Sequence, residues 1–133
     1  MLVEGRGVPI GFVVTGANVH DVKMLATVLD STVIDPPDEP GLPNLCADNG
    51  YRGISSELTI MDRNYYPHIR GRGEEKKAKT EGYRAHRWVV EACHSWQNRF
   101  RKLLVRFEKK VENYIALLQF ACALICWRKV ITR

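Results

Sequence analysis

The sequence contains few cysteines, and their arrangement argues against a disulfide scaffold. Its 133 residues include four cysteines and no Cys-x-x-Cys pair. So small a number cannot form the cross-linked framework of a small secreted domain. We therefore expect reduced thiols in a cytosolic protein, at positions 46, 93, 122 and 126.

Long apolar segments are also absent. Met1–Val3 is followed at once by Glu4 and Arg6, which leaves no room for the apolar region of a secretory signal. The longest apolar run, 115–127, is interrupted by Gln119 and is too short to cross a bilayer. These features predict a protein that is neither secreted nor inserted in a membrane.

The composition is that of one soluble globular domain over residues 1–133. Hydrophobic residues make up 45% and charged residues 26% of the chain, the balance of a folded soluble protein. Residues 1–62 carry 3 basic and 9 acidic side chains, whereas residues 63–133 carry 17 basic and 6 acidic ones. The basic half indicates a polyanion partner, although a solvated basic face without a partner explains the charge equally well.

Local patterns predict strands mixed with helices. The segments 2–3 and 10–15, joined by a glycine turn, predict a hairpin. Asn18 or Asp21 is expected to cap a helix that runs through Leu29. The further elements expected are strands at 45–47 and 65–69, helices at 55–63, 84–107 and 112–127, and flexible loops at 35–44 and 70–82. This order favours an α/β domain with helices against a sheet.

The two C-terminal helices differ in their apolar patterns. The first has an apolar stripe at spacings of three and four residues, formed by Val89, Cys93, Trp96, Phe100, Leu103 and Phe107. The three tryptophans, at 88, 96 and 127, are most simply core residues. The second helix, 112–127, is apolar nearly all round, which predicts burial in the core or in a partner.

Two carboxylates are candidates for chemistry, and each has an ordinary explanation. Asp48 follows the short apolar run 45–47 and precedes Asn-Gly, a common setting for a turn residue. Glu91 faces away from the apolar stripe and lies one turn after Arg87, which is typical of an exposed ion pair. Together the two carboxylates could hold a divalent cation, while neighbouring basic residues neutralise nucleic-acid phosphates.

Two other constellations have simpler explanations. Cys93, His94, Cys122 and Cys126 are of the types that bind zinc, but buried structural thiols explain the cysteines better. His20–Asp21 could form a catalytic pair, although a capping role at a helix entry is favoured.

Seven stretches spread over nearly the whole chain carry a resemblance to a known family. They are Gly5–Pro9, Thr15–Asn18 with His20–Asp21, Ala47–Arg52, Pro67–Arg70, Arg87–Glu91, Ser95–Arg101 and the tail from Glu108 to Trp127. Taken together, these stretches resemble the C-terminal part of a DDE transposase from bacterial insertion sequences. Each stretch alone is a weak signal, whereas the combination is specific.

The resemblance implies a fold, a cofactor and a set of site residues. The fold is ribonuclease-H-like, with a mixed sheet and flanking helices, and three acidic residues bind two Mg²⁺ or Mn²⁺ ions. Asp48 resembles the second acid and Glu91 the third. Arg87 and Glu91 match the family's helix signature, whereas Arg84 and Asn98 stand where the family has Tyr and Lys. Contacts with double-stranded DNA, at transposon ends and target, are then expected from Arg84, Arg87, Asn98, Arg99, Arg101 and Lys102.

In the family the first catalytic Asp lies on a strand before the hairpin that opens this chain. The resemblance therefore implies an N-terminally truncated catalytic domain without that acid. We expect a bacterial, cytoplasmic, nucleoid-associated transposase fragment that is inactive alone, completed by an upstream transposase polypeptide or by self-association. The alternatives are a non-catalytic, basic DNA-binding remnant and a poorly folded remnant without function.

Overall fold

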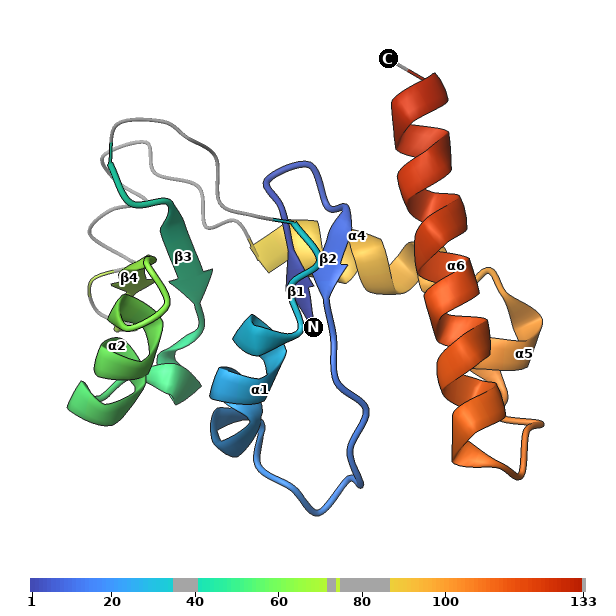
Figure 1. Cartoon of the computed structure of the whole chain (residues 1–133), viewed down its shortest axis with the longest axis horizontal. Coiled ribbons are helices and arrows are strands. Elements are labelled where there is room, and N and C mark those ends of the chain that lie inside the picture. The colour runs from blue at the N-terminus through green and yellow to red at the C-terminus, as the bar shows by residue number, and fades with distance from the viewer. Residues whose placement is uncertain (35–40, 72–73, 75–86, 133) are drawn as a thin grey trace.

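The structure is a computed structural model that describes residues 1–34, 41–71, 74 and 87–132 (Figure 1). Most of the predicted loops 35–44 and 70–82 lie outside this part of the chain. The elements are β1 (Leu2–Val3), β2 (Pro9–Gly11), η1 (Asp21–Met24), α1 (Leu25–Asp30), β3 (Asn44–Ala47), η2 (Asn49–Tyr51), α2 (Ile54–Met61), β4 (Tyr66–Ile69), α4 (Arg87–Gln97), α5 (Arg101–Leu104) and α6 (Val111–Ile131). The mixture of strands and helices confirms the α/β class.

The N-terminal hairpin is formed as predicted, but its second strand is short. β1 and β2 pair antiparallel, with Leu2 opposite Gly11. Gly7 makes the turn at φ +85°, a conformation that a side chain disfavours, and the carboxylate of Glu4 accepts from the amides of residues 6 and 8. The predicted strand 10–15 stops at Gly11 because the described residues offer no ladder partner for 12–14.

β3 and β4 form a parallel pair, in which Leu45 lies opposite Pro67 and Ala47 opposite Ile69. α2 connects the two strands, as a parallel pair requires. The main hydrophobic core lies beneath them and contains Leu25, Leu29, Leu45 and Ile60. This core joins α1 and α2 to β3, so it positions the residues that follow the end of β3.

The expected single mixed sheet is not what the structure describes. Within the described ranges there are two separate two-stranded sheets, β1–β2 and β3–β4, and Figure 1 shows β1 and β3 apart from each other. Their facing edges make no ladder with each other, so the ribonuclease-H-like sheet stays a prediction. Two-stranded sheets are marginal on their own, and packing against helices stabilises them here.

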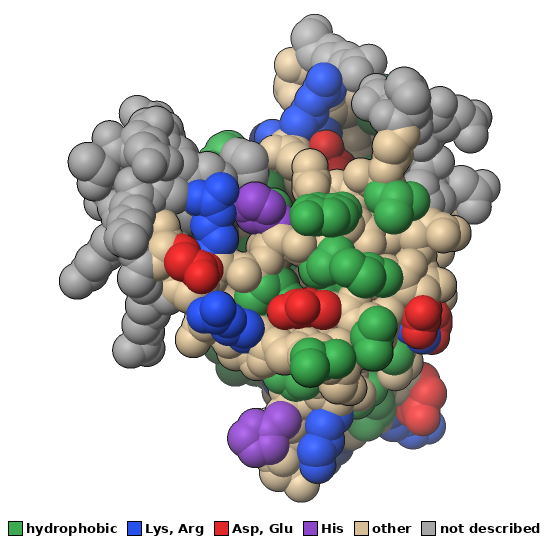
Figure 2. Space-filling model, turned by 90° about the vertical axis from the view of Figure 1, so that its left-hand side faces the viewer, with side chains coloured by type: hydrophobic (Ala, Val, Ile, Leu, Met, Phe, Trp, Pro, Cys, Tyr) green, Lys and Arg blue, Asp and Glu red, His purple; other side chains and the backbone are tan. Residues whose placement is uncertain are grey.

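The helix entries differ from the predictions in their details. The N-cap of η1 is His20, without a side-chain cap bond, so capping by Asn18 or Asp21 was wrong. α1, which ends one residue after Leu29, buries Leu25 and Leu29. α2 buries Ile60 but leaves Leu58 exposed, and Figure 2 shows hydrophobic side chains gathered on this side of the molecule.

The long helix predicted over 84–107 is interrupted. α4 ends at Gln97, and i→i+3 bonds to the amides of Arg99 and Phe100 tighten its last turn. Phe100 then adopts an extended conformation, φ −85° and ψ 100°, before α5 begins. The stripe is therefore buried at its start, at Val89 and Cys93, and exposed at its end, at Phe107.

α6 is longer and less covered than predicted. It extends over 21 residues instead of 112–127 and stands at the edge of the molecule in Figure 1. Length and composition would allow it to cross a bilayer, with 22% of its most apolar window buried, so the length argument against a span was wrong. Two of the three tryptophans, Trp88 and Trp127, are exposed and not core, while Trp96 is half-buried beneath the ammonium of Lys129.

Candidate functional site

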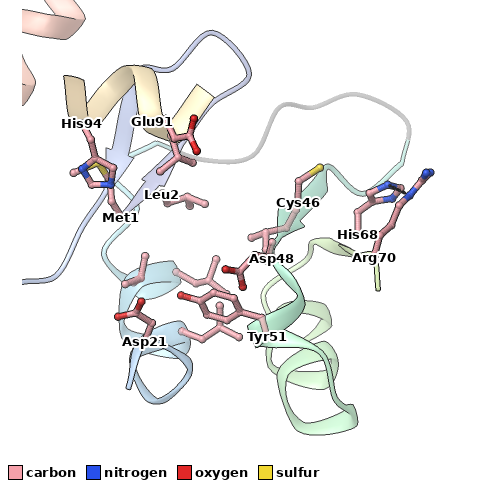
Figure 3. Close-up of a pocket in the computed structure, with 16 residues that line it drawn as sticks. Met1, Leu2, Asp21, Cys46, Asp48, Tyr51, His68, Arg70, Glu91 and His94 are labelled. Atoms are coloured by element: carbon pink, nitrogen blue, oxygen red, sulfur yellow. Dashed lines mark hydrogen bonds between the residues drawn. The ribbon is translucent and has the colours of Figure 1, made fainter. Parts of the chain in front are cut away.

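A pocket of about 480 Å³ lies between the two sheets. Its apolar lining comes from Leu2 of β1, Leu25 and Leu29 of α1, Leu45 of β3 and Val90 of α4. Ionisable side chains also line it, and Figure 3 shows Asp21, Asp48 and Tyr51 on one side with Glu91 and His94 on the other. Both carboxylates that the sequence singled out therefore reach the same pocket.

Asp48 stands where β3 ends, as predicted. It is the N-cap of η2, and its Oδ1 accepts from the amide of Gly50 at 2.9 Å. The turn-residue explanation is thus correct for this oxygen. A carboxylate has two oxygens and about four acceptor positions, so the cap leaves Asp48 able to bind a cation as well.

Glu91 lies on α4, on the side away from the buried positions. Val89 is 3% exposed and Cys93 is fully buried, whereas Glu91 is exposed and lines the pocket. The projection from the sequence is confirmed in this respect. The side chain of Arg87, its predicted ion-pair partner, lies outside the described part.

Asp21 is a third carboxylate at the pocket that the sequence analysis had assigned to capping. It lies just before α1, and its negative charge acts on Tyr51, which lines the same pocket. Burial raises the pKa of Tyr51, and the negative charges of Asp21 and Asp48 raise it further. The Tyr51 hydroxyl is therefore a protonated donor at neutral pH. Its place after Asp-Asn-Gly was the available signal for this role.

Basic groups reach the pocket from β4. His68 and Arg70 line it, and the guanidinium Nε of Arg70 donates to the imidazole Nε2 of His68 at 3.1 Å. Burial raises the pKa of the Cys46 thiol, and the positive charge of Arg70 partly offsets this effect. The sequence analysis missed both basic residues as site residues, although the stretch Pro67–Arg70 belongs to the resemblance.

The donor chemistry suits a hard divalent cation only in part. Magnesium takes one or two protein carboxylates and completes its shell with water or phosphate oxygens, and Asp48 and Glu91 are of that kind. Within residues 1–34, 41–71, 74 and 87–132, however, no group of three His, Cys, Asp or Glu lies close enough together to hold a metal. The described residues thus offer a partial ligand set.

Four of the predicted DNA-contact residues are described by the structure, and they do not line this pocket. Asn98, Arg99, Arg101 and Lys102 are exposed and follow the end of α4. α4 stops at Gln97, so Asn98 and Lys102 lie beyond the helix that carries Glu91. Arg84 lies outside the described residues.

The cysteines near α6 do not form a zinc site in the described part of the chain. Cys93 and Cys122 are buried, and the buried amide of Gln97 donates to the Cys122 sulfur at 3.4 Å. Burial raises the pKa of Cys93 to about 11. These thiols therefore stay protonated at neutral pH and act as small apolar core groups.

The comparisons with known proteins cover nearly the whole chain. Residues 1–126 match the family described as Transposase DDE domain. One relative is a protein of Burkholderia cepacia that is named as a transposase for insertion sequence element IS402. It is 33% identical to this chain over an alignment of 135 residues, which covers 96% of this chain. The chain spans 61% of the length of that relative. No solved structure matches.

Proposed function

The chain belongs to the DDE transposase family, and on that premise we propose that its pocket is part of the centre that cleaves DNA and joins DNA strands. The observation that carries the proposal is the convergence of Asp48, from the end of β3, and Glu91, from α4, on one pocket. These elements are far apart in the sequence, and only the fold brings them together. The location proposed with this activity is the bacterial cytoplasm, at the nucleoid.

Asp48 and Glu91 would hold the Mg²⁺ or Mn²⁺ ions. Such ions, when bound, activate a water and stabilise the attacking and leaving oxygens of a phosphodiester. Asp48 is well suited because its cap to Gly50 fixes the orientation of the carboxylate. Arg70 stands where it can neutralise a phosphate that enters the pocket, and the protonated Tyr51 hydroxyl can donate to a phosphate oxygen.

The first acid of the family is proposed to come from outside this chain, on an extended segment that fills the space between β1 and β3. The pocket has apolar walls from Leu2, Leu25 and Leu45, which suit the apolar side chains of a central strand. The relative is longer than this chain, which leaves room for such a segment. An upstream transposase polypeptide is the expected source.

Double-stranded DNA is the proposed substrate, and exposed basic residues would position it. Residues 99–110 contain six Lys or Arg and one Glu, and the four predicted contacts Asn98, Arg99, Arg101 and Lys102 are exposed. Arg84 and the side chain of Arg87 lie outside the described part of the chain, so both residues stay predicted contacts. Basic side chains of this kind bind phosphates and release counterions.

The metal site is tested first by binding, because the two proposed ligands, Asp48 and Glu91, both belong to this chain. Mn²⁺ added to the purified chain is expected to broaden the NMR signals of Asp48, Tyr51 and Glu91 selectively. Asp48→Asn and Glu91→Gln should each weaken the effect, while Glu57→Gln, on α2 outside the pocket, should leave it unchanged. Equal broadening in all variants would contradict the site.

Activity is tested by Mg²⁺-dependent nicking of a DNA duplex that carries a transposon end. The purified chain alone is expected to nick poorly. Robust nicking that Asp48→Ala abolishes would show a complete enzyme and refute the need for the family's first acid from elsewhere.

A second candidate function is DNA binding without catalysis, which the exposed basic residues between α4 and α6 favour. It predicts that the logarithm of the DNA-binding constant falls steeply with that of the salt concentration. It also predicts that neither Mg²⁺ nor Asp48→Ala changes the binding. A Mg²⁺ requirement for binding at the duplex end would favour the catalytic function instead.

A further inference from the structure

α6 has two apolar faces, and the described part of the chain covers only one of them. Leu118, Ala121, Cys122 and Ile125 are buried against the rest of the molecule, where α6 contacts α4, α5 and β2. The opposite side carries exposed apolar residues. Phe120 is 63%, Trp127 64% and Val130 71% exposed.

The exposed residues form a regular stripe along the helix. We define the outer stripe as Asn113, Ala116, Phe120, Ala123, Trp127 and Val130, all of them exposed. Successive members are three or four residues apart, alternately, which is the spacing of a coiled-coil seam. At 100° per residue they occupy an arc of roughly 100° on the side opposite the buried face. Two faces of this kind explain why the helix is apolar nearly all round.

The sizes of the side chains in the outer stripe are self-complementary. When a second α6 is laid antiparallel with its centre between Phe120 and Ala123, Phe120 faces Ala123 of the second copy. In the same register Trp127 faces Ala116, and Val130 faces Asn113. Each large side chain thus meets a small one, which lets the two helices approach closely and interdigitate. A two-fold axis relates the two copies in this register, so each such contact occurs twice in the dimer.

We propose that the outer stripe of α6 binds the outer stripe of a second copy of this chain, with the two helices antiparallel. The opposed helix dipoles also favour this orientation. The proposal depends on α6 alone, and it holds or fails independently of the metal site.

The exposed area is sufficient for such a dimer. An aromatic side chain of about 200 Å² that is nearly two-thirds exposed offers about 130 Å², and Val130 and Ile131, 71% and 60% exposed, add to the two aromatic residues. The stripe and its neighbours then contribute on the order of 500 Å² per chain, and a pair buries on the order of 1,000 Å², the lower limit of a specific interface. An apolar patch of this size matches the largest patch that a typical monomer exposes, and such a patch often marks an interaction site.

Sedimentation equilibrium of the purified chain between about 1 and 100 μM tests the proposal, since weak specific dimers have dissociation constants in this range. The chain should form dimers. Phe120→Glu and Trp127→Glu should each raise the dissociation constant at least about 30-fold, because central aromatic residues dominate such interfaces. Trp88→Glu is the matched control, since Trp88 is a 57% exposed tryptophan on α4 outside the stripe, and it should leave the dimer intact.

Three results would overturn the proposal. They are a monomer at all these concentrations, equal dissociation in the Trp88 control, and a monomer that partitions into phospholipid vesicles through the same residues. Circular dichroism verifies that each variant keeps its helices, and the substituted positions are exposed, so folding is expected to survive.

Cross-linking tests the orientation. In a Cys46→Ser background, a Phe120→Cys chain is mixed with an Ala123→Cys chain and oxidised mildly. An antiparallel pair predicts the mixed disulfide between the two variants. Disulfides formed only between identical variants would indicate a parallel pair and refute the proposed register.

Discussion

Asp48 has two separable roles, which two substitutions distinguish. Its Oδ1 accepts from the Gly50 amide at 2.9 Å, and Asn keeps an oxygen there while it removes the charge. Ala removes both. Loss of an exposed cap costs about 0.5–1 kcal/mol, and a domain of this size loses about 3–5 °C of Tm per kcal/mol. Asp48→Ala should therefore lower Tm by about 2–5 °C.

Asp48→Asn should keep or slightly raise Tm, because it removes one of three negative charges around the pocket (Figure 3). The two variants should respond alike to Mn²⁺. A site with a Kd of about 1 mM stabilises the wild-type chain by about 1.4 kcal/mol at about 10 mM ion, and neither variant should gain this. The assay is thermal unfolding with and without Mn²⁺. An Asn variant as unstable as the Ala variant, or one still stabilised by Mn²⁺, would refute the reasoning.

The other predictions concern the core, an ion pair and the thiols. Ile60→Ala should lower the free energy of unfolding by about 3 kcal/mol in urea, because Ile60 is fully buried; a loss below about 1 kcal/mol would mean that the core is loosely packed. The hydrogen bond from Arg63 lowers the pKa of Asp30. This pair stabilises the fold above the unfolded pKa of about 4 and ceases to do so as pH falls through the lower folded value. Asp30→Asn should thus reduce stability slightly at pH 7 and not at pH 2, and an effect that is equal at both would exclude the pair. Iodoacetamide at pH 8 should modify the exposed Cys46 well before Cys93, whose pKa is raised to about 11; comparable rates in the folded protein would contradict the burial of Cys93.

Local signals in the sequence were sufficient where a structure depends on neighbouring residues. The glycine turn after Val3 predicted the hairpin, and the apolar run before Asp48 predicted a strand that delivers a carboxylate at its end. The spacing of Val89 and Cys93 located the buried face of α4 and placed Glu91 away from it. Turn formation and amphipathic periodicity act over a few residues, so a single sequence displays them directly.

Other features depended on contacts between distant segments. No local pattern showed that the β1–β2 and β3–β4 pairs form separate sheets, because strand pairing is decided by packing across the whole chain. The break of α4 after Gln97 was missed because the apolar spacing continues through Phe100 and Leu103. Asp21 was read as a cap because nothing in its neighbourhood indicates a pocket formed by β1, β3 and α4.

The amino-acid order by itself determined the local elements, the charge division and the family to which the chain belongs. Tertiary structure alone decided that Asp48 and Glu91 line one pocket, and that α6 buries one apolar face and leaves the other in solvent. The physical reason is that hydrophobic periodicity specifies which face of an element is apolar. It does not specify what that face packs against, since this depends on segments that lie far away in the sequence.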